Sequence, residues 1–431
     1  MEYWDPNVER TPPNELKSLQ EKNLRALLSY VYAYSDFHRK RFKEAGIDPR
    51  DIESLEDLRK LPFMVKRDFR DTYPTGMFCV PRNQVVRYHA SSGTTGKPTL
   101  VGYTRNDITE WSTSLARGLT SLGIGRGDVM QNAYGYGLFT GGLGFHYAGE
   151  MVGAVVLPTG AGTTERQIEL MQDLGTTAIS CTPSYFLYLC ETARALGVNL
   201  RETKLKAGLF GAEPWSEDMR KRIEDNGIKA YDVYGTSELS GPLFTECTYQ
   251  RGMHVWADQF LVEVVDPKTG ENVSDGERGE LVFTTLKKEA LPLIRYRTGD
   301  LTSLESEVCD CGRTHPRIMK ILARVDDMLV IRGINVFPSQ VESALMRIPE
   351  LGDNYELIVD RVHELDTLMV RVEARKEIFA DGASALSALE SKVSHGLRNI
   401  LSLDVKVEIL EPQKIARSIG KAKRVTDKRK I

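Results

Sequence analysis

Apolar residues recur at intervals of three and four near the start of the chain. Between residues 15 and 43 they include Leu16, Leu24 and Val31, and Gly46 follows. This spacing lines one face of an α-helix with apolar side chains, and glycine is common just beyond a helix end. We expect one amphipathic helix over residues 15–43 that is ended by Gly46.

Further along, short apolar runs alternate with stretches of helical spacing. The expected strands are residues 128–134, 154–158, 178–183, 207–211 and 230–234, and the helices between them include residues 106–122 and 167–174. Strand and helix in regular alternation predict βαβ units and a mainly parallel sheet. Because such sheets bind ligands beyond the carboxyl ends of their strands, the loops after these runs are candidate binding segments.

After residue 253 the pattern changes twice. Residues 260–265 and 280–285 alternate around a turn-rich stretch, 266–279, which predicts an antiparallel β-subdomain. Beyond residues 324–327 the expected strands are 328–331, 356–359, 369–374 and 405–410, and the expected helices are 340–347 and 383–400. The predicted fold class is α/β. A large N-terminal domain over residues 1–323 has mainly parallel sheets flanked by helices, and a hinge over 324–327 leads to a small α+β domain over 328–431.

Composition narrows the class of function. The 431 residues hold 57 basic and 60 acidic side chains, a formal charge of −3, which argues against a dedicated nucleic-acid-binding protein. No apolar run approaches the roughly 18 residues of a membrane helix, and residues 1–10 lack the features of a secretory signal. We therefore expect a cytoplasmic protein without membrane spans. Six cysteines are too few for a disulfide scaffold, and Cys79, Cys181 and Cys190 lie in apolar surroundings that predict buried, reduced thiols.

The segment Ser91-Ser-Gly-Thr-Thr-Gly-Lys-Pro-Thr99 is rich in glycine and hydroxyl groups. Backbone N–H groups of such a loop can approach phosphate oxygens, and the hydroxyls and Lys97 add donors. The segment is not a P-loop, because Ser91 replaces the first glycine of that motif and Pro98 replaces its final serine or threonine. We interpret it as a phosphate-binding loop, with an ordinary polar turn as the alternative.

Two more motifs carry candidate nucleotide ligands. Tyr234-Gly-Thr-Ser-Glu238 supplies a tyrosine able to cover an adenine ring and a glutamate able to hold Mg²⁺ near phosphates. In Tyr296-Arg-Thr-Gly-Asp300, the aspartate is suited to accept hydrogen bonds from two ribose hydroxyls. Each motif alone is also compatible with an ordinary turn.

Taken together, these motifs resemble those of the adenylate-forming (acyl-CoA ligase) superfamily in order and rough spacing. The phenylacetate–CoA ligase family is the closer match, and the resemblance spans essentially the whole chain. It is carried by Trp4-Asp-Pro6, the Gly-rich segment 134–144, Phe210-Gly-Ala-Glu-Pro-Trp215, residues 326–339 and Gly420-Lys-Ala-Lys-Arg-Val425. The resemblance implies two half-reactions. A carboxylate attacks the α-phosphate of ATP to give an acyl-adenylate and pyrophosphate, and the thiol of coenzyme A then displaces AMP to leave a thioester.

The resemblance also implies roles for single residues. Glu238 would bind Mg²⁺, Thr94 would lie near the bridged phosphates, and Lys421 would sit between the carboxylate and the α-phosphate during adenylation. The other residues expected to contact ATP or AMP are Ser91, Ser92, Gly93, Thr95, Gly96, Lys97, Gly211, Ala212, Glu213, Pro214, Tyr234, Gly235, Thr236, Asp300 and Arg324. The family further implies a mobile C-terminal domain that turns about Asp326 between the two steps, and a homodimer.

The acyl pocket is indicated by aromatic and small residues. Its expected lining is Tyr134, Tyr136, Phe139, Gly141, Pro242 and Leu243, which suits a flat aryl ring, although ordinary core packing uses the same residue types. Ala323, Ile419 and Phe145 depart from the family pattern, and a bulky Phe145 is expected to reshape the pocket. The expected substrate is a small, phenylacetate-like aryl carboxylate, in keeping with aromatic acid degradation.

A separate set of residues suits a metal ion. Cys247 and His254 are seven residues apart, and Cys309 and Cys311 form a Cys-x-Cys pair further along. Three thiolates and one imidazole make a tetrahedral set of the structural zinc kind, and part of the family has a similar set. His315 is an alternative to His254, and free thiols on loops are the alternative to a metal site.

Other functions stay open on the sequence alone. An enzyme that stops at the adenylate, like the relatives that adenylylate a deazaflavin cofactor, would need no coenzyme A. An adenylation enzyme could instead load a separate carrier protein. A nucleotide-binding regulatory protein is a further alternative, but it would not need Lys421, Glu238 and Asp300 together.

Overall fold

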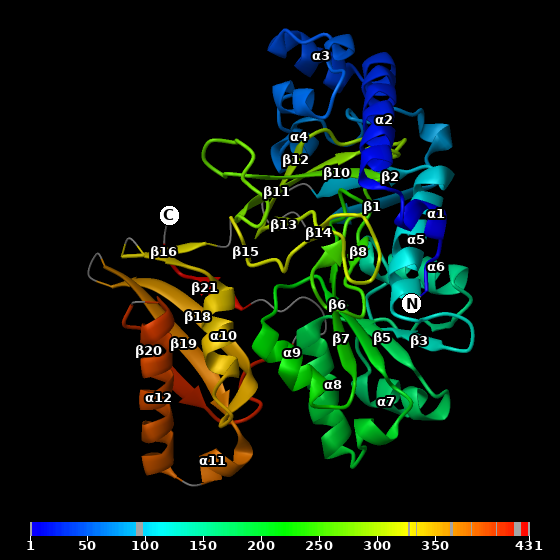
Figure 1. Cartoon of the computed structure of the whole chain (residues 1–431). Coiled ribbons are helices and arrows are strands. Elements are labelled where there is room, and N and C mark those ends of the chain that lie inside the picture. Colours follow the sequence, from blue (N-terminus) through cyan, green and yellow to red (C-terminus); the bar gives the residue numbers. More distant parts are fainter. Residues whose placement is uncertain are drawn as a thin grey trace. The chain divides into compact units, whose positions relative to one another are not determined.

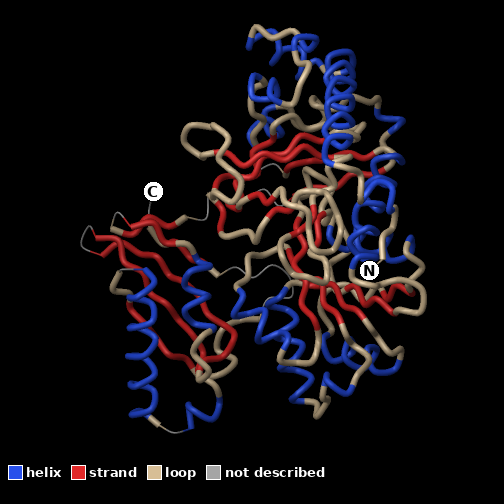
Figure 2. Tube along the Cα trace, viewed as in Figure 1, coloured by secondary structure: helices blue, strands red, loops and turns tan. Residues whose placement is uncertain are grey.

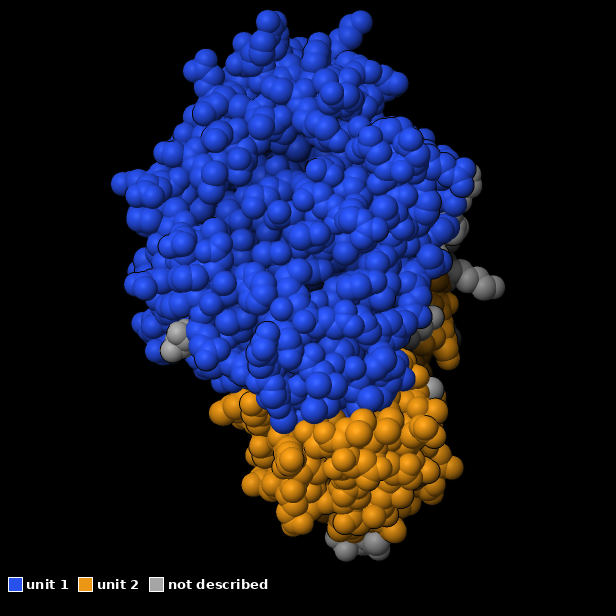
Figure 3. All heavy atoms as spheres, turned by 90° about the vertical axis from the view of Figure 1, so that its right-hand side faces the viewer, with its two compact units in different colours: residues 1–160, 177–180, 231–321 blue, residues 161–176, 181–230, 322–431 orange. Residues whose placement is uncertain are grey.

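The computed structural model describes residues 2–91, 98–325, 328–332, 334–362, 365–380, 382–401, 403–417 and 424–429 (Figure 1). The chain divides into two compact units, which Figure 3 colours separately. Unit 1 comprises Met1–Gly160, Thr177–Ser180 and Tyr231–Ile321, and unit 2 comprises Ala161–Thr176, Cys181–Ala230 and Leu322–Ile431. Within the described residues, no helix combines the length and the apolar character needed to cross a bilayer.

Unit 1 begins with helices. They are α1 (Pro6–Glu9), α2 (Pro13–Tyr34), α3 (Asp36–Ala45) and α4 (Lys66–Asp71), with 3-10 turns at Pro49–Asp51, Glu56–Lys60 and Arg82–Gln84. The expectation of one continuous helix over residues 15–43 is wrong, because Ser35 interrupts it with an extended backbone (φ −122°, ψ 114°). Ser35 Oγ accepts a hydrogen bond from the His38 N–H at 3.4 Å and so caps α3, which ends at Gly46 as expected.

The α/β part of unit 1 has the predicted parallel pairing. Its elements are α5 (Arg105–Ser121), β3 (Val129–Asn132), α6 (Gly141–Met151), β4 (Val155–Leu157) and β5 (Ala178–Cys181). β3 is parallel to both β4 and β5, with Met130 level with Val156 and Ala178. Every residue of β5 is buried, which explains why this strand is an apolar run without alternation.

The rest of unit 1 is antiparallel. β1 (Arg87–Ser91) pairs with β2 (Thr99–Tyr103), and β7 (Lys229–Tyr234) pairs with β8 (Phe244–Thr245). β11 (Gly279–Thr285) lies between β10 (Phe260–Val265) and β12 (Tyr296–Thr302), and β14 (Arg317–Ile318) lies between β13 (Leu304–Glu305) and β9 (Met253–His254). These strands confirm the predicted β-subdomain. Phe244, Phe260 and Phe283 meet in its core with ring centroids 5.1–6.3 Å apart.

Unit 2 combines helices with a second sheet. It holds α7 (Thr164–Asp173), α8 (Pro183–Ala195), a 3-10 turn (Leu200–Glu202), β6 (Ala207–Gly211), α9 (Glu217–Glu224) and β15 (Ala323–Arg324), followed by a hairpin of β16 (Leu329–Ile331) and β17 (Ile334–Val336). The sheet has the order β20 (Lys406–Leu410), β19 (Leu365–Ala374), β18 (Leu351–Val362), β21 (Val425–Asp427). The helices of this segment are α10 (Pro338–Met346), α11 (Lys376–Ala380) and α12 (Ala383–Leu401). α10 and α12 contact each other and pack on the sheet (Figure 2).

Candidate active site and metal centre

The predicted phosphate loop connects two paired strands. Ser91 ends β1 and lies opposite Thr99, the first residue of β2, so the two ends of the loop are fixed by the ladder. Ser91 Oγ donates a hydrogen bond to Glu238 Oε1 at 3.4 Å, across 147 residues of sequence. The structure therefore brings the first and second motifs together. The expected phosphate ligands Ser92, Gly93, Thr94, Thr95, Gly96 and Lys97 lie outside the described residues, as do Asp326 and Lys421.

The second and third motifs also meet. Tyr234, the last residue of β7, donates a hydrogen bond from Oη to Asp300 Oδ2 at 2.7 Å. Its ring stacks on Phe244 and Phe283, each with centroids 6.4 Å from its own. The Asp300 N–H donates to Thr298 Oγ1 at 3.0 Å, which fixes the backbone at the carboxylate. A buried aromatic ring beside an oriented carboxylate suits an adenosine, with the base near the ring and the ribose hydroxyls near the carboxylate.

Two side chains, Tyr103 and Lys288, hold the turn after Tyr234 through hydrogen bonds to its carbonyl groups. Tyr103 Oη donates to the carbonyl of Ser237 at 2.8 Å, and Lys288 Nζ donates to the carbonyl of Glu238 at 2.7 Å. The Lys288 ammonium also lies 4.8 Å from the centre of the Tyr103 ring, a cation–π contact. Burial lowers the pKa of Lys288 to about 8, against the raising influence of Asp107 and Glu238. Neither Tyr103 nor Lys288 stands in a recognisable motif, so neither could be predicted from the sequence.

Small and polar residues complete this turn. A Cβ on Gly235 would lie 2.5 Å from the Cα of Gly241, so only glycine fits there. Thr236 Oγ1 is buried and has no hydrogen-bond partner among the described residues. The Glu238 side chain is buried, and within the described part of the chain its carboxylate makes no ion pair. A buried polar group without a partner is costly, so Thr236 suits a polar ligand, and a buried carboxylate that accepts only from a hydroxyl can still bind a cation.

The remaining predicted nucleotide ligands belong to unit 2. Gly211 ends β6, and Ala212 follows in the left-handed region with φ 69°. Glu213 accepts a hydrogen bond from the Ser184 N–H at the start of α8, at 2.8 Å. Arg324 ends the short strand β15. Pro214 follows Glu213 directly. Residues 211–214 therefore form a strand end and turn of the kind that binds ligands in α/β proteins.

Aromatic side chains gather between β3 and α6, where the acyl pocket was expected. Tyr136 and Phe139 are 37% and 45% exposed, whereas Tyr134 is buried. Phe145 is also buried and stacks parallel to Tyr134 with centroids 5.5 Å apart. Phe145 thus supports Tyr134 from the core. A Cβ on Gly141 would lie 2.4 Å from the Phe139 ring, so the glycine lets that ring lie close to the helix.

Pro242 and Leu243 lie beside the buried Trp111. Trp111 Nε1 donates a hydrogen bond to the Pro242 carbonyl at 2.9 Å. A Cβ on Gly144 would lie 2.7 Å from the Trp111 indole and 2.8 Å from Pro242 Cδ. Only glycine therefore fits at this position of α6. Leu243 is buried and packs in the main core of unit 1. Small residues therefore let α5, α6 and the Pro242 turn approach one another closely.

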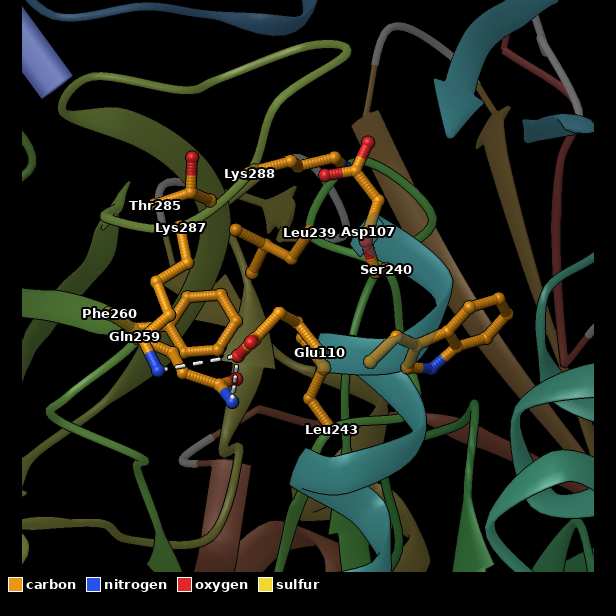
Figure 4. Close-up of a pocket in the computed structure, with 11 residues that line it drawn as sticks. Asp107, Glu110, Leu239, Ser240, Leu243, Gln259, Phe260, Thr285, Lys287 and Lys288 are labelled. Carbon is orange, nitrogen blue, oxygen red and sulfur yellow. Dashed lines mark hydrogen bonds and ion pairs between the residues drawn. The ribbon is translucent and has the colours of Figure 1, made fainter. Parts of the chain in front are cut away.

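A cavity under the Glu238 turn is too small to be the substrate pocket. It has a volume of about 30 Å³, and Leu239 and Leu243 form part of its lining (Figure 4). Glu110 accepts hydrogen bonds here from Gln259 at 2.9 Å and from Lys287 at 3.4 Å. A cavity of this size holds a water molecule or two, not an aryl ring.

Cys247, His254, Cys309 and Cys311 come together as predicted. All four are buried, and their candidate ligand atoms lie within 4.8 Å of one another. Cys247 Sγ is 3.8 Å from Cys309 Sγ, and Cys311 Sγ is 3.4 Å from His254 Nε2. Zinc bound at its usual distances of about 2.3 Å to sulfur and 2.0 Å to nitrogen would set tetrahedral edges of roughly 3.8 and 3.5 Å. The Cys247–Cys309 and Cys311–His254 pairs have this spacing, and hydrogen bonds from Cys247 and Cys309 lower the pKa of Cys311.

The structure decides between the two histidines. His315 Nδ1 accepts a hydrogen bond from the Ala257 N–H at 2.8 Å, and His315 Nε2 donates to the Val8 carbonyl at 2.9 Å. Both of its ring nitrogens are therefore occupied, and the alternative that His315 replaces His254 is wrong. His254 instead directs Nε2 at Cys311, which makes it the fourth candidate ligand.

The first residues of the chain pack around this cysteine cluster. Arg313 and Glu9 form a fully buried ion pair at 2.6 Å, and Arg313 Nη1 lies 3.6 Å from Cys311 Sγ. Tyr3 Oη donates a hydrogen bond to the Cys311 carbonyl at 2.7 Å. Gly312 has φ 83°, and a Cβ there would lie 2.6 Å from the Tyr3 hydroxyl. The candidate metal site therefore ties the N-terminal segment to the β-subdomain.

Family comparisons agree with the motifs. Residues 53–286 match the family described as AMP-binding enzyme, and residues 333–429 match the AMP-binding enzyme C-terminal domain. The chain is 47% identical to the phenylacetate-coenzyme A ligase of Thermus thermophilus, over 99% of this chain and 100% of the relative. It is 46% identical to the phenylacetate-coenzyme A ligase of Escherichia coli (strain K12), over 98% and 97%.

Solved structures give the same result. The structure is similar to that of 2-hydroxyisobutyryl-CoA ligase in the postadenylation state in complex with R3-HIB-AMP, with a TM-score of 0.94 and 32% identity over 99% of this chain and 92% of that one. The TM-score is 0.73, at 33% identity and the same coverage, for that ligase with 2-HIB-AMP and CoA in the thioesterification state. These are two structures of the same ligase, one with R3-HIB-AMP and one with 2-HIB-AMP and CoA.

Proposed function

Because this chain belongs to the phenylacetate–coenzyme A ligase family of adenylate-forming enzymes, we propose that it joins a small aryl carboxylate to coenzyme A, using ATP and releasing AMP and pyrophosphate. The observation that carries the proposal is the meeting of three separate motifs in unit 1. Ser91 bonds Glu238, and Tyr234 bonds Asp300. These hydrogen bonds hold the nucleotide-binding groups in place before a nucleotide binds. Less free energy is therefore needed to order the site on binding.

Each half-reaction develops negative charge that fixed donors and cations can stabilise. In the first, a carboxylate oxygen attacks the α-phosphorus and pyrophosphate leaves. We assign Mg²⁺ to Glu238, because a buried carboxylate without an ion pair among the described residues suits a hard cation. Asp300, oriented by Tyr234, would hold the ribose while the acyl group changes its bond from phosphate to sulfur.

The first experiment measures AMP and thioester with a panel of acids. Phenylacetate, indole-3-acetate and benzoate are each incubated with Mg-ATP, with and without coenzyme A, and products are identified by mass. We expect AMP and an aryl thioester that both depend on coenzyme A. Pyrophosphate without any thioester would instead favour an enzyme that stops at the adenylate or loads a carrier protein.

A second experiment separates the two half-reactions. Lys421→Ala should lower adenylation about 10²–10³-fold, because one donor directed at the reacting phosphate is lost. It should leave thioester formation from supplied acyl-adenylate near the wild-type rate. Lys414→Ala, which removes a lysine of the same C-terminal stretch, is the matched control and should change neither step. Equal loss in both steps for Lys421→Ala would contradict the assigned role.

We also propose that Cys247, His254, Cys309 and Cys311 bind one structural Zn²⁺. The support is their burial and the closeness of their ligand atoms, two pairs of which have the spacing that a tetrahedral zinc site needs. Four protein ligands leave no open position on the ion, so its role would be to hold loops together rather than to take part in the reaction. Protein purified without chelator should contain about one zinc per chain, and Cys309→Ser should lose it. Cys190→Ser, at a buried cysteine of α8 outside the cluster, should keep it, whereas a wild-type ratio near zero would contradict the site.

Three expectations stay predictions. They are the hinge at residues 324–327, the homodimer and the cytoplasmic location. Limited proteolysis should cut first at the hinge and release a fragment that begins near residue 328. Light scattering of the purified chain should give twice the mass of one chain.

A further inference from the structure

Four polar groups form a continuous hydrogen-bonded chain between β3 and α6. Asn132 Nδ2 lies 2.7 Å from Tyr136 Oη, Tyr136 Oη lies 3.2 Å from His146 Nδ1, and His146 Nε2 lies 3.2 Å from Glu150 Oε1. The Tyr136 and His146 rings meet edge to face with centroids 5.7 Å apart. All four residues belong to unit 1, and Tyr136 is one of the residues expected to line the acyl pocket.

The neighbours of Asn132 fix the first link of this chain. Its Nδ2 lies 2.6 Å from the carbonyl of Gly142, which can only accept a hydrogen bond. Its Oδ1 accepts from the Tyr134 N–H at 3.4 Å, which can only donate, and from Ser180 Oγ at 3.0 Å. The amide therefore has one orientation, and its second Nδ2 proton is donated to Tyr136 Oη.

The other end of the chain fixes the second link. The Glu150 side chain is 58% exposed, and a carboxylate only accepts hydrogen bonds. His146 Nε2 must then carry the proton, and Nδ1 of a neutral imidazole is left as an acceptor. Among the described residues the Tyr136 hydroxyl is the donor that faces that nitrogen, so its single proton is committed to His146.

These two links fix how the Tyr136 hydroxyl can hydrogen-bond. It donates its proton to His146 and accepts a hydrogen bond from Asn132 with one lone pair, so one lone pair remains free to accept. The residue is 37% exposed and lies three residues from Phe139, which is 45% exposed. A molecule that reaches this hydroxyl therefore meets a hydrogen-bond acceptor and not a donor.

We propose that Tyr136 is a specificity-determining residue that favours aryl acids bearing a hydrogen-bond donor on the ring, such as a phenolic hydroxyl, a ring amine or an indole N–H. The inference rests on the proposed function, because it assumes that aryl acids bind beside Tyr136. A ring with a donor hydrogen-bonds to the free lone pair in place of solvent. A ring without one excludes solvent and leaves the lone pair unsatisfied, which disfavours binding. His146 and Glu150 act through Tyr136 and are positioning residues.

The test is a ratio of substrates that differ in hydrogen bonding but little in size. The ratio R is kcat/KM for hydroxyphenylacetate divided by kcat/KM for fluorophenylacetate. It is measured once with both substituents at ring position 3 and once with both at position 4. The measurements are made at about pH 8, where imidazoles are neutral. At one of these positions, Tyr136→Phe should lower R roughly three- to tenfold, the effect of one hydrogen bond to a partly exposed group. The ratio cancels any general loss of activity in the variant.

His146→Leu tests the direction of the hydrogen bond. Without the imidazole the Tyr136 proton is released, so R should fall and the relative kcat/KM of an acceptor-only substrate, acetylphenylacetate, should rise. A merely structural role of His146 would lower all substrates together. Tyr147→Phe is the matched control, because its hydroxyl bonds Arg87 at 2.8 Å and lies outside the chain of four, so R should not change.

Each outcome decides the proposal. If wild-type enzyme forms aryl thioesters and R is the same within twofold in Tyr136→Phe at both ring positions, the inference fails and the proposed function stands. If no aryl acid yields a thioester, the proposed function is wrong, and the inference about Tyr136 is wrong as well. A lower R in Tyr136→Phe and a raised acceptor preference in His146→Leu would support both.

Discussion

The buried Lys288 offers the sharpest test of how the Glu238 turn is held. Its ammonium is buried, donates to the Glu238 carbonyl at 2.7 Å and lies over the Tyr103 ring. Lys288→Met keeps most of the volume and removes the charge and the hydrogen bond. We expect the variant to lose activity while its unfolding free energy near pH 7 changes little, because the lost contacts and the relieved burial of a charge have opposite signs.

The pH dependence gives this prediction a magnitude. Burial lowers the pKa of Lys288 from its ordinary value of 10.5 to about 8. Below about pH 8 the group is charged in both the folded and the unfolded chain, and its burial destabilises the fold. Between about pH 8 and 10.5 the unfolded chain binds more protons than the folded one, so this residue makes the unfolding free energy rise with pH. The full rise is about 3 kcal/mol, from 1.36 kcal/mol for each pH unit between the two pKa values.

The assay is urea unfolding at several pH values from about 7 to 10.5, for wild type and Lys288→Met. The difference in unfolding free energy, wild type minus variant, should increase by up to about 3 kcal/mol across this range. Taking the difference removes the contributions of other titrating groups. A flat difference for Lys288→Met would refute the argument that a charged lysine is buried under the turn.

Three further predictions concern other parts of the chain. Glu9→Gln should lower the unfolding free energy by about 3–5 kcal/mol, because it leaves the Arg313 charge buried without its partner, and urea unfolding of a double variant that also carries Arg313→Met should show a smaller loss. Tyr234→Phe should raise the KM for ATP roughly three- to tenfold through the lost hydrogen bond to Asp300, and steady-state kinetics in which the KM for the acid changes equally would contradict this. Removal of zinc by a strong chelator should lower the midpoint of thermal unfolding of wild type and leave that of Cys309→Ser unchanged.

The strands could be predicted because the burial of a strand determines its local pattern of apolar residues. The runs at residues 207–211 and 260–265 match β6 and β10 residue for residue, since continuous or alternating apolar positions follow directly from how many faces of a strand are buried. The break at Ser35 was missed because apolar spacing continues across it, although serine is a strong N-cap residue. β21 was missed because three residues give no periodicity, and its pairing with β18 depends on tertiary contact.

Some residues of the candidate site could be predicted from the sequence in the same way, and others could not. Tyr234, Glu238 and Asp300 could be predicted because each stands in a short motif, whereas the hydrogen bond from Tyr234 to Asp300 is visible only in the structure. Lys288 could not, because a Lys-Lys pair after a strand is typical of a solvated turn and only the fold buries it. For the cysteine cluster, residue types indicated the chemistry, but only the hydrogen bonds of His315 decided which histidine faces the thiols.

The buried pair of Glu9 and Arg313 has a consequence for how the protein is made. The two residues are 304 positions apart. At a synthesis rate of roughly 5–20 residues per second, the N-terminal segment leaves the ribosome about 15–60 s before its partner. During that interval neither this segment nor the cysteine cluster, whose last ligand is Cys311, can reach its final arrangement. Chaperone capture and zinc delivery would therefore act on a chain already nearly three-quarters synthesised, and variants of this region should show their effects as yield in the cell before they show them as loss of activity.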